Sequence, residues 1–363
     1  MNKQRMIIDR FYQNFKDSFY HDVPVKHPDA LSDFRKAEFG EKSLQEKDCF
    51  NQWMYQQNQN NQRIYCYVDD QVVGHQSAMK VDLKVGDKVV KAAYATDLRV
   101  RPEWKMKGLG VALMGKLIND YDVVISLGVS DEAYKMFKRQ GWIDLGKTNF
   151  YLKPLTIKGL FSKDAPMTPA IRLRNYLALV YSKMNDLICS IVSPSLELAP
   201  FTQFNDSHEK LCELTTNESK NWVRKNKEYL NWRFFSFPGK YQYEAFQSFD
   251  KNGELSGFAV VKKTPWKDRE ALVIVELHTR EDNLDAFVHQ LIKKAKQKKV
   301  DVVLFQGIEP LVEKALLKRA FFIRPYGDRF IIYNNRPELQ DAMKDVANWE
   351  ISFSDSDMDF CFY

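Results

Sequence analysis

The segment from Leu98 to Leu113 holds the residue types that a phosphate-binding loop requires. Gly108 and Gly110 stand two positions apart, and between Arg99 and Lys116 five cations face one anion. Glycines let a backbone approach a ligand closely, and a helix that begins at the second glycine offers unpaired N–H groups and the positive end of its dipole. We therefore predict an anion site in this loop.

The surrounding pattern disfavours two common nucleotides. Neither the GxGxxG pattern of dinucleotide sites nor the GxxxxGK[ST] pattern of P-loops is present, which argues against NAD and ATP. The net charge of +6 over 363 residues is small, so we expect no nucleic-acid partner.

Cysteine usage and hydropathy predict the compartment. The five cysteines are scattered without a metal-ligand spacing, so we expect reduced thiols and no metal site. The N-terminus lacks the apolar core of a secretion signal, and no stretch of about 20 apolar residues predicts an integral membrane segment. The sequence therefore predicts a cytoplasmic protein.

Local patterns predict the elements that position the loop. Residues 62–101 alternate as an antiparallel meander with turns at Asp69-Asp-Gln71 and Gly86-Asp87, and Pro102 ends it. Leucines and methionines at helical spacing follow from residue 109, then a compact apolar strand at 123–127 and a helix at 131–139 closed by Gly141.

The same order recurs later in the chain. Asp122-Val-Val124 is matched by Asp301-Val-Val303, an offset of 179, and Lys138-Arg139 by Lys318-Arg319, an offset of 180. Asp97-Leu-Arg99 aligns with Glu276-Leu-His278. A fixed period indicates a duplicated α+β unit, and we predict domains at residues 1–153 and 201–363 joined by a helical linker at 154–200.

The linker contains one amphipathic helix. Thr168 is its expected N-cap and Pro169 its first residue. Apolar residues from Ile171 to Ile191 form a broad stripe. We expect this stripe to pack between or across the domains, with an interfacial membrane helix as the alternative.

Two motifs in the first unit resemble the GNAT superfamily of acyl-CoA-dependent N-acyltransferases. Lys105-Met-Lys-Gly108-Leu-Gly110 is similar to the [RQ]-x-x-G-x-[GA] signature, with Lys in the first place. Ser130-Asp-Glu-Ala133-Tyr-Lys-Met-Phe137-Lys-Arg-Gln-Gly141-Trp142 is similar to the family's N-x-x-A-x-x-x-Y-x-x-x-G-[FW] pattern. The resemblance implies two GNAT-like domains, each a mixed, mostly antiparallel sheet flanked by helices.

The resemblance also implies acetyl-CoA as co-substrate and a set of residues that bind it. Backbone amides of the loop would hold the pyrophosphate, and the strand end would pair with the pantetheine arm. The implied residues are Leu98, Val100, Lys105, Met106, Lys107, Gly108, Leu109, Gly110, Val111, Ser130 and Phe137. The amide near Leu98 would also face the oxyanion that forms on attack.

The acid and base of the reaction stay open at this stage. The family's usual tyrosine acid is replaced by Phe137, and Tyr134 lies three residues earlier. Strand alternation predicts that Tyr94 shares a face with Leu98 while Asp97 points to the other face. We consider Tyr94, Asp97 and His75 as candidate bases.

The second unit lacks the glycine loop, since Arg280-Glu-Asp-Asn occupies the corresponding place. Acidic residues there would repel phosphates, so we expect a degenerate copy that completes a substrate cleft. Trp232, Arg233 and His278 are the candidate walls for an acceptor, with core packing as the alternative for the aromatic residues. The acidic residues Asp355, Asp357 and Asp359 either form a solvated end or enter the cleft.

These features predict an N-acetyltransferase that moves an acetyl group from acetyl-CoA to a small-molecule primary amine. By fold-level analogy the amine is an amino sugar of surface polysaccharide synthesis. The alternatives are an aminoacyl or longer-chain acyl transferase, and a non-catalytic protein that binds acyl-CoA or a partner.

Overall fold

The structure is a computed structural model that describes residues 3–21, 28–40, 43–58, 61–160, 168–192, 196–216, 219–238, 243–324 and 327–361. The strands of the first sheet are β1 (Phe19–His21), β2 (Gln62–Val68), β3 (Gln71–Val85), β4 (Lys88–Val100), β5 (Val123–Leu127), β6 (Ile143–Lys147), β9 (Asn221–Val223) and β15 (Arg329–Asn334). The strands of the second sheet are β7 (Asn149–Pro154), β8 (Ala199–Phe201), β10 (Tyr243–Phe249), β11 (Leu255–Trp266), β12 (Arg269–Thr279), β13 (Val302–Gly307) and β14 (Phe322–Arg324).

Helices cover the two sheets. They are α1 (Lys3–Phe15), α2 (Pro28–Phe39), α3 (Asp48–Asn51), α4 (Leu109–Asp120), α5 (Asp131–Arg139), α6 (Pro169–Val192), α7 (Asp206–Thr215), α8 (Lys227–Leu230), α9 (Glu281–Gln297), α10 (Pro310–Lys318) and α11 (Gln340–Met343). Short π-helical segments η2 (Gln52–Gln57) and η5 (Asn231–Phe235) extend α3 and α8.

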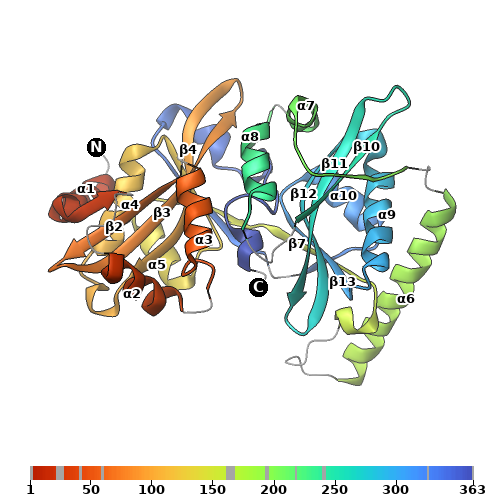
Figure 1. The fold of residues 1–363 in the computed structure, drawn as a ribbon, viewed down its shortest axis with the longest axis horizontal. Helices are drawn as coiled ribbons and strands as arrows, with labels where there is room; N and C mark the ends of the chain where they lie inside the picture. The colour runs from red at the N-terminus through yellow and green to blue at the C-terminus, as the bar shows by residue number, and fades with distance from the viewer. Residues whose placement is uncertain are drawn as a thin grey trace.

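The two sheets stand side by side, and each carries its own helices (Figure 1). The first runs β1-β2-β3-β4-β5-β15-β6, and the second runs β14-β7-β13-β12-β11-β10-β8. Most neighbouring strands are antiparallel, while β4 with β5 and β12 with β13 are parallel. The predicted α+β class with two mostly antiparallel sheets is confirmed.

Local patterns located the first unit accurately. The meander is β2-β3-β4, with Asp69, Asp70 and Gly86 at positive φ in its turns. The buried run at 123–127 is β5, and the helix at 131–139 is α5. These elements are short-range in sequence, so periodicity and turn residues are sufficient to predict them.

The duplication is visible in the strand register. Ala92 pairs with Val123 in the first sheet, and Ala271 pairs with Val302 in the second, so both partners are displaced by 179 residues. We call the elements from α3 to β7 the first copy, and those from α8 to β15 the second copy.

Each copy gives its last strand to the other sheet. Strand β7 lies between β14 and β13 of the second sheet, and β15 lies between β5 and β6 of the first. The sheets therefore do not follow the predicted boundaries, because residues 149–154 and 329–334 cross them. The division at 1–153, 154–200 and 201–363 remains a prediction about folding units.

Two tryptophans mark the symmetric contact between the copies. Trp53 and Trp232 are also 179 residues apart, and their rings stack at 4.7 Å with an interplanar angle of 10°. Each indole N–H donates to the backbone carbonyl of the other residue, at 2.9 Å and 3.0 Å. The reciprocal pair sits in a core cluster that contains buried residues from both sheets.

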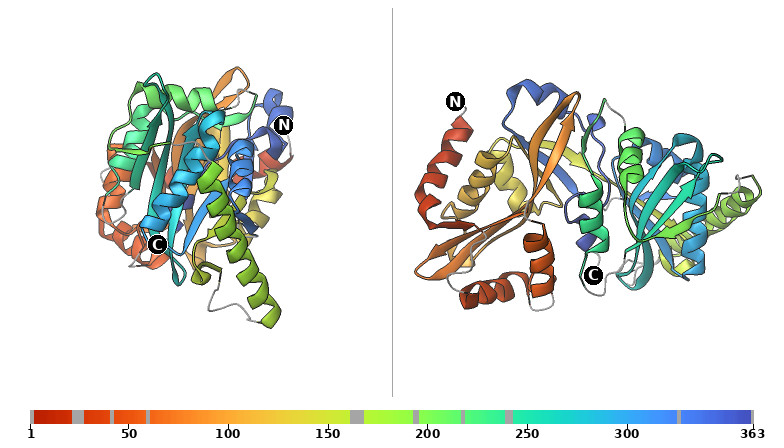
Figure 2. Two further views of the ribbon diagram at one scale, coloured as in Figure 1. Left: turned by 90° about the vertical axis from the view of Figure 1, so that its right-hand side faces the viewer. Right: turned by 45° about the horizontal axis from the view of Figure 1, so that its top comes forward.

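The C-terminal tail, residues 351–359, enters this shared core. All of its residues except Asp357 are buried, and the end of the chain lies between the two halves (Figures 1 and 2). The solvated end is therefore wrong, and entry of the acidic residues into a substrate cleft stays a prediction.

The expectation for the linker helix is wrong. Helix α6 begins after Thr168, whose hydroxyl accepts from the Ile171 amide at 3.3 Å as an N-cap, but it does not lie between the sheets. It runs along the outer edge of the second half and projects from it (Figures 1 and 2). Linker residues 161–167 and 193–195 lie outside the described residues.

Candidate functional site

Strands β4 and β5 separate before the loop that follows β4, so one edge of β4 is left unpaired there among the described residues. The two strands pair from Ala92 to Tyr94 opposite Val123 to Ile125. In the described part of the chain, β4 beyond Tyr94 pairs only with β3. The backbone of Leu98 and Val100 thus has one free side, as the addition of an extended ligand requires.

The loop after β4 presents amides at the start of α4. Gly108 is the N-cap at φ +84°, and a Cβ there would overlap the ring of Phe11. Among the described residues, no acceptor is found for the amides of Gly108, Leu109, Gly110 and Val111. Four unpaired donors at the positive end of a helix form a cradle for phosphate oxygens.

Two cations lie near this cradle. The Lys107 ammonium lies 4.3 Å from the Trp104 ring centroid, and Lys105 lies 3.9 Å from Glu132. Met106 is 99% exposed and has φ +65°.

Two other cations of the segment are engaged elsewhere. Lys116 pairs with Asp120 at 2.7 Å, and Arg101 Nε donates to the Val72 carbonyl at 2.7 Å. Asp120 therefore offsets the charge of Lys116, while Arg101 keeps its charge but is held against β3.

Helix α5 closes the other side of the opening. The Ser130 hydroxyl accepts from the Ala133 amide at 3.3 Å as the N-cap of α5. Phe137 is 3% exposed and stacks on Trp142 at 4.6 Å. Phe137 is thus a core residue beneath the site.

Tyr134 is held near the surface by Asp144 and Arg329. Its hydroxyl donates to Asp144 Oδ2 at 2.6 Å, and the Arg329 guanidinium lies 3.9 Å over its ring. The hydrogen bond to Asp144 raises the pKa of Tyr134.

We expect Tyr134→Phe to change kcat by less than about twofold, because a CoA thiol with a pKa of about 8.5 leaves as thiolate at little cost. Steady-state rates at saturating acyl-CoA check this. A loss of about 10²-fold with intact CoA affinity would instead identify Tyr134 as the general acid.

A β-bulge at Asp97 changes which residues face the opening. The register between β3 and β4 shifts between His75 and Ser77, and Asp97 adopts φ +56°. Leu98 consequently packs with Ala93 and Ala95 beneath α4, while Tyr94 packs into the core between the sheets. The predicted shared face of Tyr94 and Leu98 is wrong, because a bulge inserts one residue and reverses the alternation.

Asp97 is the carboxylate at this bulge. The Gln45 side-chain amide donates to its Oδ1 at 3.2 Å. Burial, and after it the carboxylate of Asp357, raise the pKa of Asp97 to about 7. A carboxylate with this pKa can accept a proton near neutral pH.

The other two candidate bases are less suited. His75 lies between Asp97 and Ser77, with Nδ1 3.0 Å from the Asp97 carbonyl and Nε2 3.1 Å from Ser77 Oγ. Burial, and next the charge of Arg63, lower the pKa of His75 to about 3. Burial, and next Asp355, raise the pKa of Tyr94, so its hydroxyl stays protonated.

A small cavity adjoins the bulge. Its lining is mostly polar or aromatic. The lining residues include Gln45, Asn51, Tyr55, Arg63, Tyr65, His75 and Asp97.

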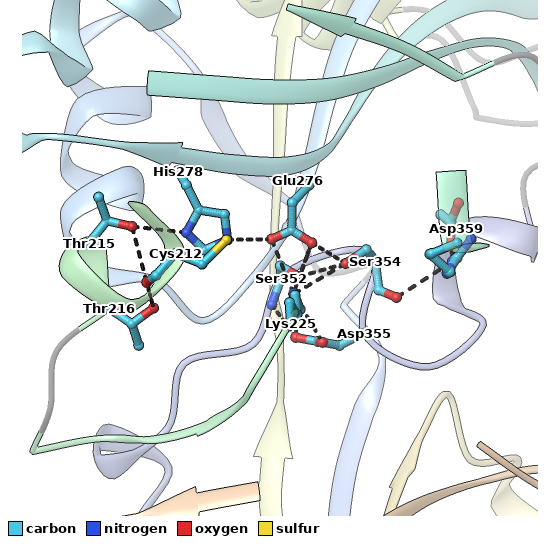
Figure 3. Close-up of polar contacts among 11 residues, drawn as sticks. Cys212, Thr215, Thr216, Lys225, Glu276, His278, Ser352, Ser354, Asp355 and Asp359 are labelled. Atoms are coloured by element: carbon cyan, nitrogen blue, oxygen red, sulfur yellow. Dashed lines mark hydrogen bonds and ion pairs between the residues drawn. The ribbon is translucent and has the colours of Figure 1, made fainter. Parts of the chain in front are cut away.

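The second copy places a carboxylate at the equivalent bulge and neutralises it. Glu276, 179 residues after Asp97, follows the register shift in β12. Lys225 Nζ contacts Glu276 at 2.9 Å, Asp355 at 3.2 Å and Ser352 Oγ at 2.5 Å (Figure 3). Burial would raise the pKa of Glu276, but Lys225 outweighs it and lowers that pKa, so this carboxylate stays ionised.

The second copy also lacks the phosphate loop. Helix α9 begins at Glu281, directly after β12, so the first two turns of a helix replace the loop. A cleft of about 710 Å³ remains at this place, and its lining includes five acidic residues, Glu276, Glu281, Glu309, Glu350 and Asp355. CoA phosphates would be repelled from it.

The three predicted acceptor residues occupy different environments. His278 lines the acidic cleft and contacts Glu276 at 2.9 Å and Thr215 at 3.0 Å (Figure 3). Arg233 is fully buried, pairs with Asp359, and donates to the Tyr243 hydroxyl at 3.0 Å. Arg233 therefore cannot contact an acceptor, and core packing is its role.

Trp232 is mostly enclosed but has an edge on a groove between the halves. It is 8% exposed, and the groove of about 990 Å³ is also lined by Lys80, Asp82 and Glu228. Residues of both copies thus form this groove.

The C-terminal tail runs past two polar residues of β4, Tyr94 and Asp97. After burial, the charge of Asp355 is the next cause that raises the pKa of Tyr94, and the charge of Asp357 does the same for Asp97. Sequence reasoning missed Gln45, Lys225 and the role of Glu276. The alignment of Asp97 with Glu276 at the 179-residue offset was the available signal for the last of these.

Comparison with known proteins agrees with this geometry. Residues 7–143 match the family model of the acetyltransferase (GNAT) domain, which confirms the resemblance of the first unit. A search of curated proteins gives no match.

Solved structures share the fold over most of the chain. A probable N-acyltransferase from Enterococcus faecalis V583 has 9% identity and a TM-score of 0.59, with coverage of 88% of this chain and 73% of that one. A GCN5-related N-acetyltransferase from Anabaena variabilis has 14% identity, a TM-score of 0.58 and the same coverage. Saccharomyces cerevisiae N-myristoyltransferase with bound myristoyl-CoA has 14% identity, a TM-score of 0.54, and coverage of 87% and 79%.

Proposed function

We propose, for a chain that contains an acetyltransferase (GNAT) domain, that the protein transfers an acetyl group from acetyl-CoA to a small primary amine. The observation that carries the proposal is the pair of open β4 backbone and unpaired α4 amides in the first copy. The amine attacks the thioester carbonyl, the C–S bond breaks, CoA leaves as thiolate, and the amine proton passes to the protein.

Asp97 is the proposed base. It lies at the strand bulge where the thioester would be placed, and its pKa of about 7 matches proton transfer near neutral pH. The equivalent Glu276 is ion-paired with Lys225, which supports a single catalytic copy. Asp357 beside Asp97 would attract an ammonium group to the same place.

A short acyl group is favoured by the cavity at the bulge. The cavity is small, and its lining contains Arg63, Asn51 and Asp97. A hydrocarbon chain gains free energy from burial against apolar groups, and the polar groups of this lining offer it little such surface. Acetyl is therefore preferred over a longer chain.

The acceptor is proposed to enter through the groove between the copies. Asp82 and Glu228 supply carboxylates there, beside the cations Lys80 and Arg224, and the Trp232 edge offers an apolar surface. An amino sugar is the first acceptor to test. Turnover of acetyl-CoA with amino sugars, polyamines and peptides tests this choice. Tight acetyl-CoA binding without turnover on any amine would favour the non-catalytic alternative.

Gly110→Asp is expected to weaken acetyl-CoA binding by about thirtyfold, because it places a negative charge at the N-terminus of α4. Gly110→Ala is the matched control: its Cβ would lie 3.5 Å from Met136 Sδ, an ordinary contact, so affinity should change little. Gly108 is less suitable, since any side chain there collides with Phe11.

Calorimetry measures both variants, with one site per chain expected in the wild type. At a hundredfold excess over Kd, acetyl-CoA should stabilise the wild-type fold by about 2.7 kcal/mol. Equal affinity in wild type and Gly110→Asp, or two equivalent sites, would contradict the proposed loop.

A further inference from the structure

Helix α6 exposes the apolar face that it would be expected to bury. Its large apolar residues on this face are between 54% and 77% exposed, namely Leu173, Tyr176, Leu177, Tyr181, Met184, Leu187, Ile188, Ile191 and Val192. They recur at spacings of three and four residues, so they form one continuous stripe along the helix. We call this stripe the α6 face.

Polar side chains on the opposite side of α6 hold the helix against the protein through ion pairs and hydrogen bonds. Asp186 is 6% exposed and contacts Lys153 Nζ at 2.9 Å and Lys296 Nζ at 2.7 Å. Ser182 donates to the Pro154 carbonyl at 3.1 Å, and Asn175 to the Leu160 carbonyl at 3.3 Å. A buried ion pair fixes the rotation of the helix, so the α6 face cannot turn inward without leaving those charges unpaired.

The exposed charges on α6 have one sign. Arg172, Arg174 and Lys183 are exposed, while the single acidic residue of the helix, Asp186, is buried. The patch continues onto β14, where the Phe322 ring lies 6.3 Å from that of Tyr181 and Ile323 is 54% exposed. An apolar stripe with a cationic rim is the pattern of a helix that lies on an anionic lipid surface.

We propose that α6 docks the protein onto the surface of an anionic membrane, with the α6 face buried among the acyl chains and its cations on headgroup phosphates. The helix lies in the plane of the interface over about 36 Å. It does not cross the bilayer: among the described residues no helix is long and apolar enough to do so. The proposal is independent of the catalytic role, because α6 stands at the outer edge of the second half (Figure 1).

A second copy of the chain fits the α6 face less well. Two-stranded coiled coils use a narrow seam flanked by charged residues that pair across the interface. Here Tyr176, Tyr181 and Ile188 flank the central residues, and the remaining exposed charges of the helix are all positive and would repel each other in a symmetric pair. The apolar stripe is therefore wider than a coiled-coil seam, and the cations at its edge are suited to contact headgroup phosphates.

Cosedimentation tests the proposal with the full chain and two kinds of vesicle: phosphatidylcholine alone, and equal parts of phosphatidylcholine and phosphatidylglycerol. Wild type should bind the anionic vesicles. Leu177→Glu combined with Leu187→Glu should weaken this binding by at least about tenfold. Arg172→Gln combined with Lys183→Gln should weaken it by about 25-fold, since each cation contributes about fivefold near an anionic surface.

Leu214→Glu is the matched control, because Leu214 is 64% exposed on α7, away from the α6 face. It should bind like wild type, and all variants should keep the wild-type melting temperature. Absence of binding to anionic vesicles, or an equal loss in Leu214→Glu, would overturn the proposal. So would a dimer in sedimentation equilibrium that Leu177→Glu with Leu187→Glu dissociates and that excludes vesicles, which would assign the α6 face to a second copy.

Discussion

Asp97→Asn is expected to lower kcat by about 10²- to 10⁴-fold, the usual contribution of a positioned general base. Asparagine keeps the shape of the side chain and can still accept from Gln45, which donates to Asp97 at 3.2 Å, but it cannot take the amine proton. The affinity for acetyl-CoA should not change. Steady-state kinetics and calorimetry on the same preparation separate the two quantities.

The pH profile gives a second measurement on the same variant. Because burial and Asp357 raise the pKa of Asp97 to about 7, kcat/KM of the wild type should rise with pH through that value. This rise of kcat/KM with pH should be missing in Asp97→Asn. A rise that persists unchanged would identify another group as the base.

The free energy of unfolding should fall as pH rises, whereas kcat/KM rises. The folded pKa of Asp97 lies above its unfolded value of about 3.9, so the folded state binds a proton that the unfolded state has released. Stability therefore falls as pH rises between about 4 and 7. Asp97→Asn removes this contribution and is expected to raise the melting temperature at pH 8. A fall in both rate and melting temperature would indicate a structural role instead.

Lys225→Met is expected to lower the free energy of unfolding by about 3 to 5 kcal/mol, the cost of breaking a buried ion pair. Lys225 is 7% exposed, and its ammonium is the shared partner of Glu276 and Asp355. Its loss removes the ammonium that two buried carboxylates share and leaves His278 as the remaining cationic partner of Glu276. Denaturant titration at neutral pH measures the effect.

The decrease in the free energy of unfolding at acidic pH tests the role of the same cluster. Lys225 lowers the pKa of Glu276 below its usual range, so the cluster stabilises the fold above the unfolded pKa of glutamate. That stability is lost as pH falls below it. In Lys225→Met this dependence should be much reduced.

Lys227→Met is the matched control for Lys225→Met. Lys227 is two residues away and pairs with Asp206 at 2.5 Å on the surface, where ion pairs contribute little. No measurable change in unfolding is expected. Similar losses in the two variants would contradict the assigned role of the buried cluster.

Sequence by itself was sufficient for the elements of the first copy. The meander, the loop with Gly108 and Gly110, and the two helices after it depend on interactions between residues near in sequence, so their spacing predicts them. The 179-residue offset likewise predicted the duplicated order of elements. It also aligned Asp97 with Glu276 before any contact was known.

Only the tertiary structure decided which face and which partner each of these residues has. The exchange of β7 and β15 depends on pairing between distant strands, and the bulge at Asp97 depends on a register shift against β3. Helix α6 has the apolar period of a buried helix, but the ion pair between Lys153 and Asp186 turns that face outward. Burial and charge pairing join residues far apart in sequence, and periodicity within one segment carries no information about them.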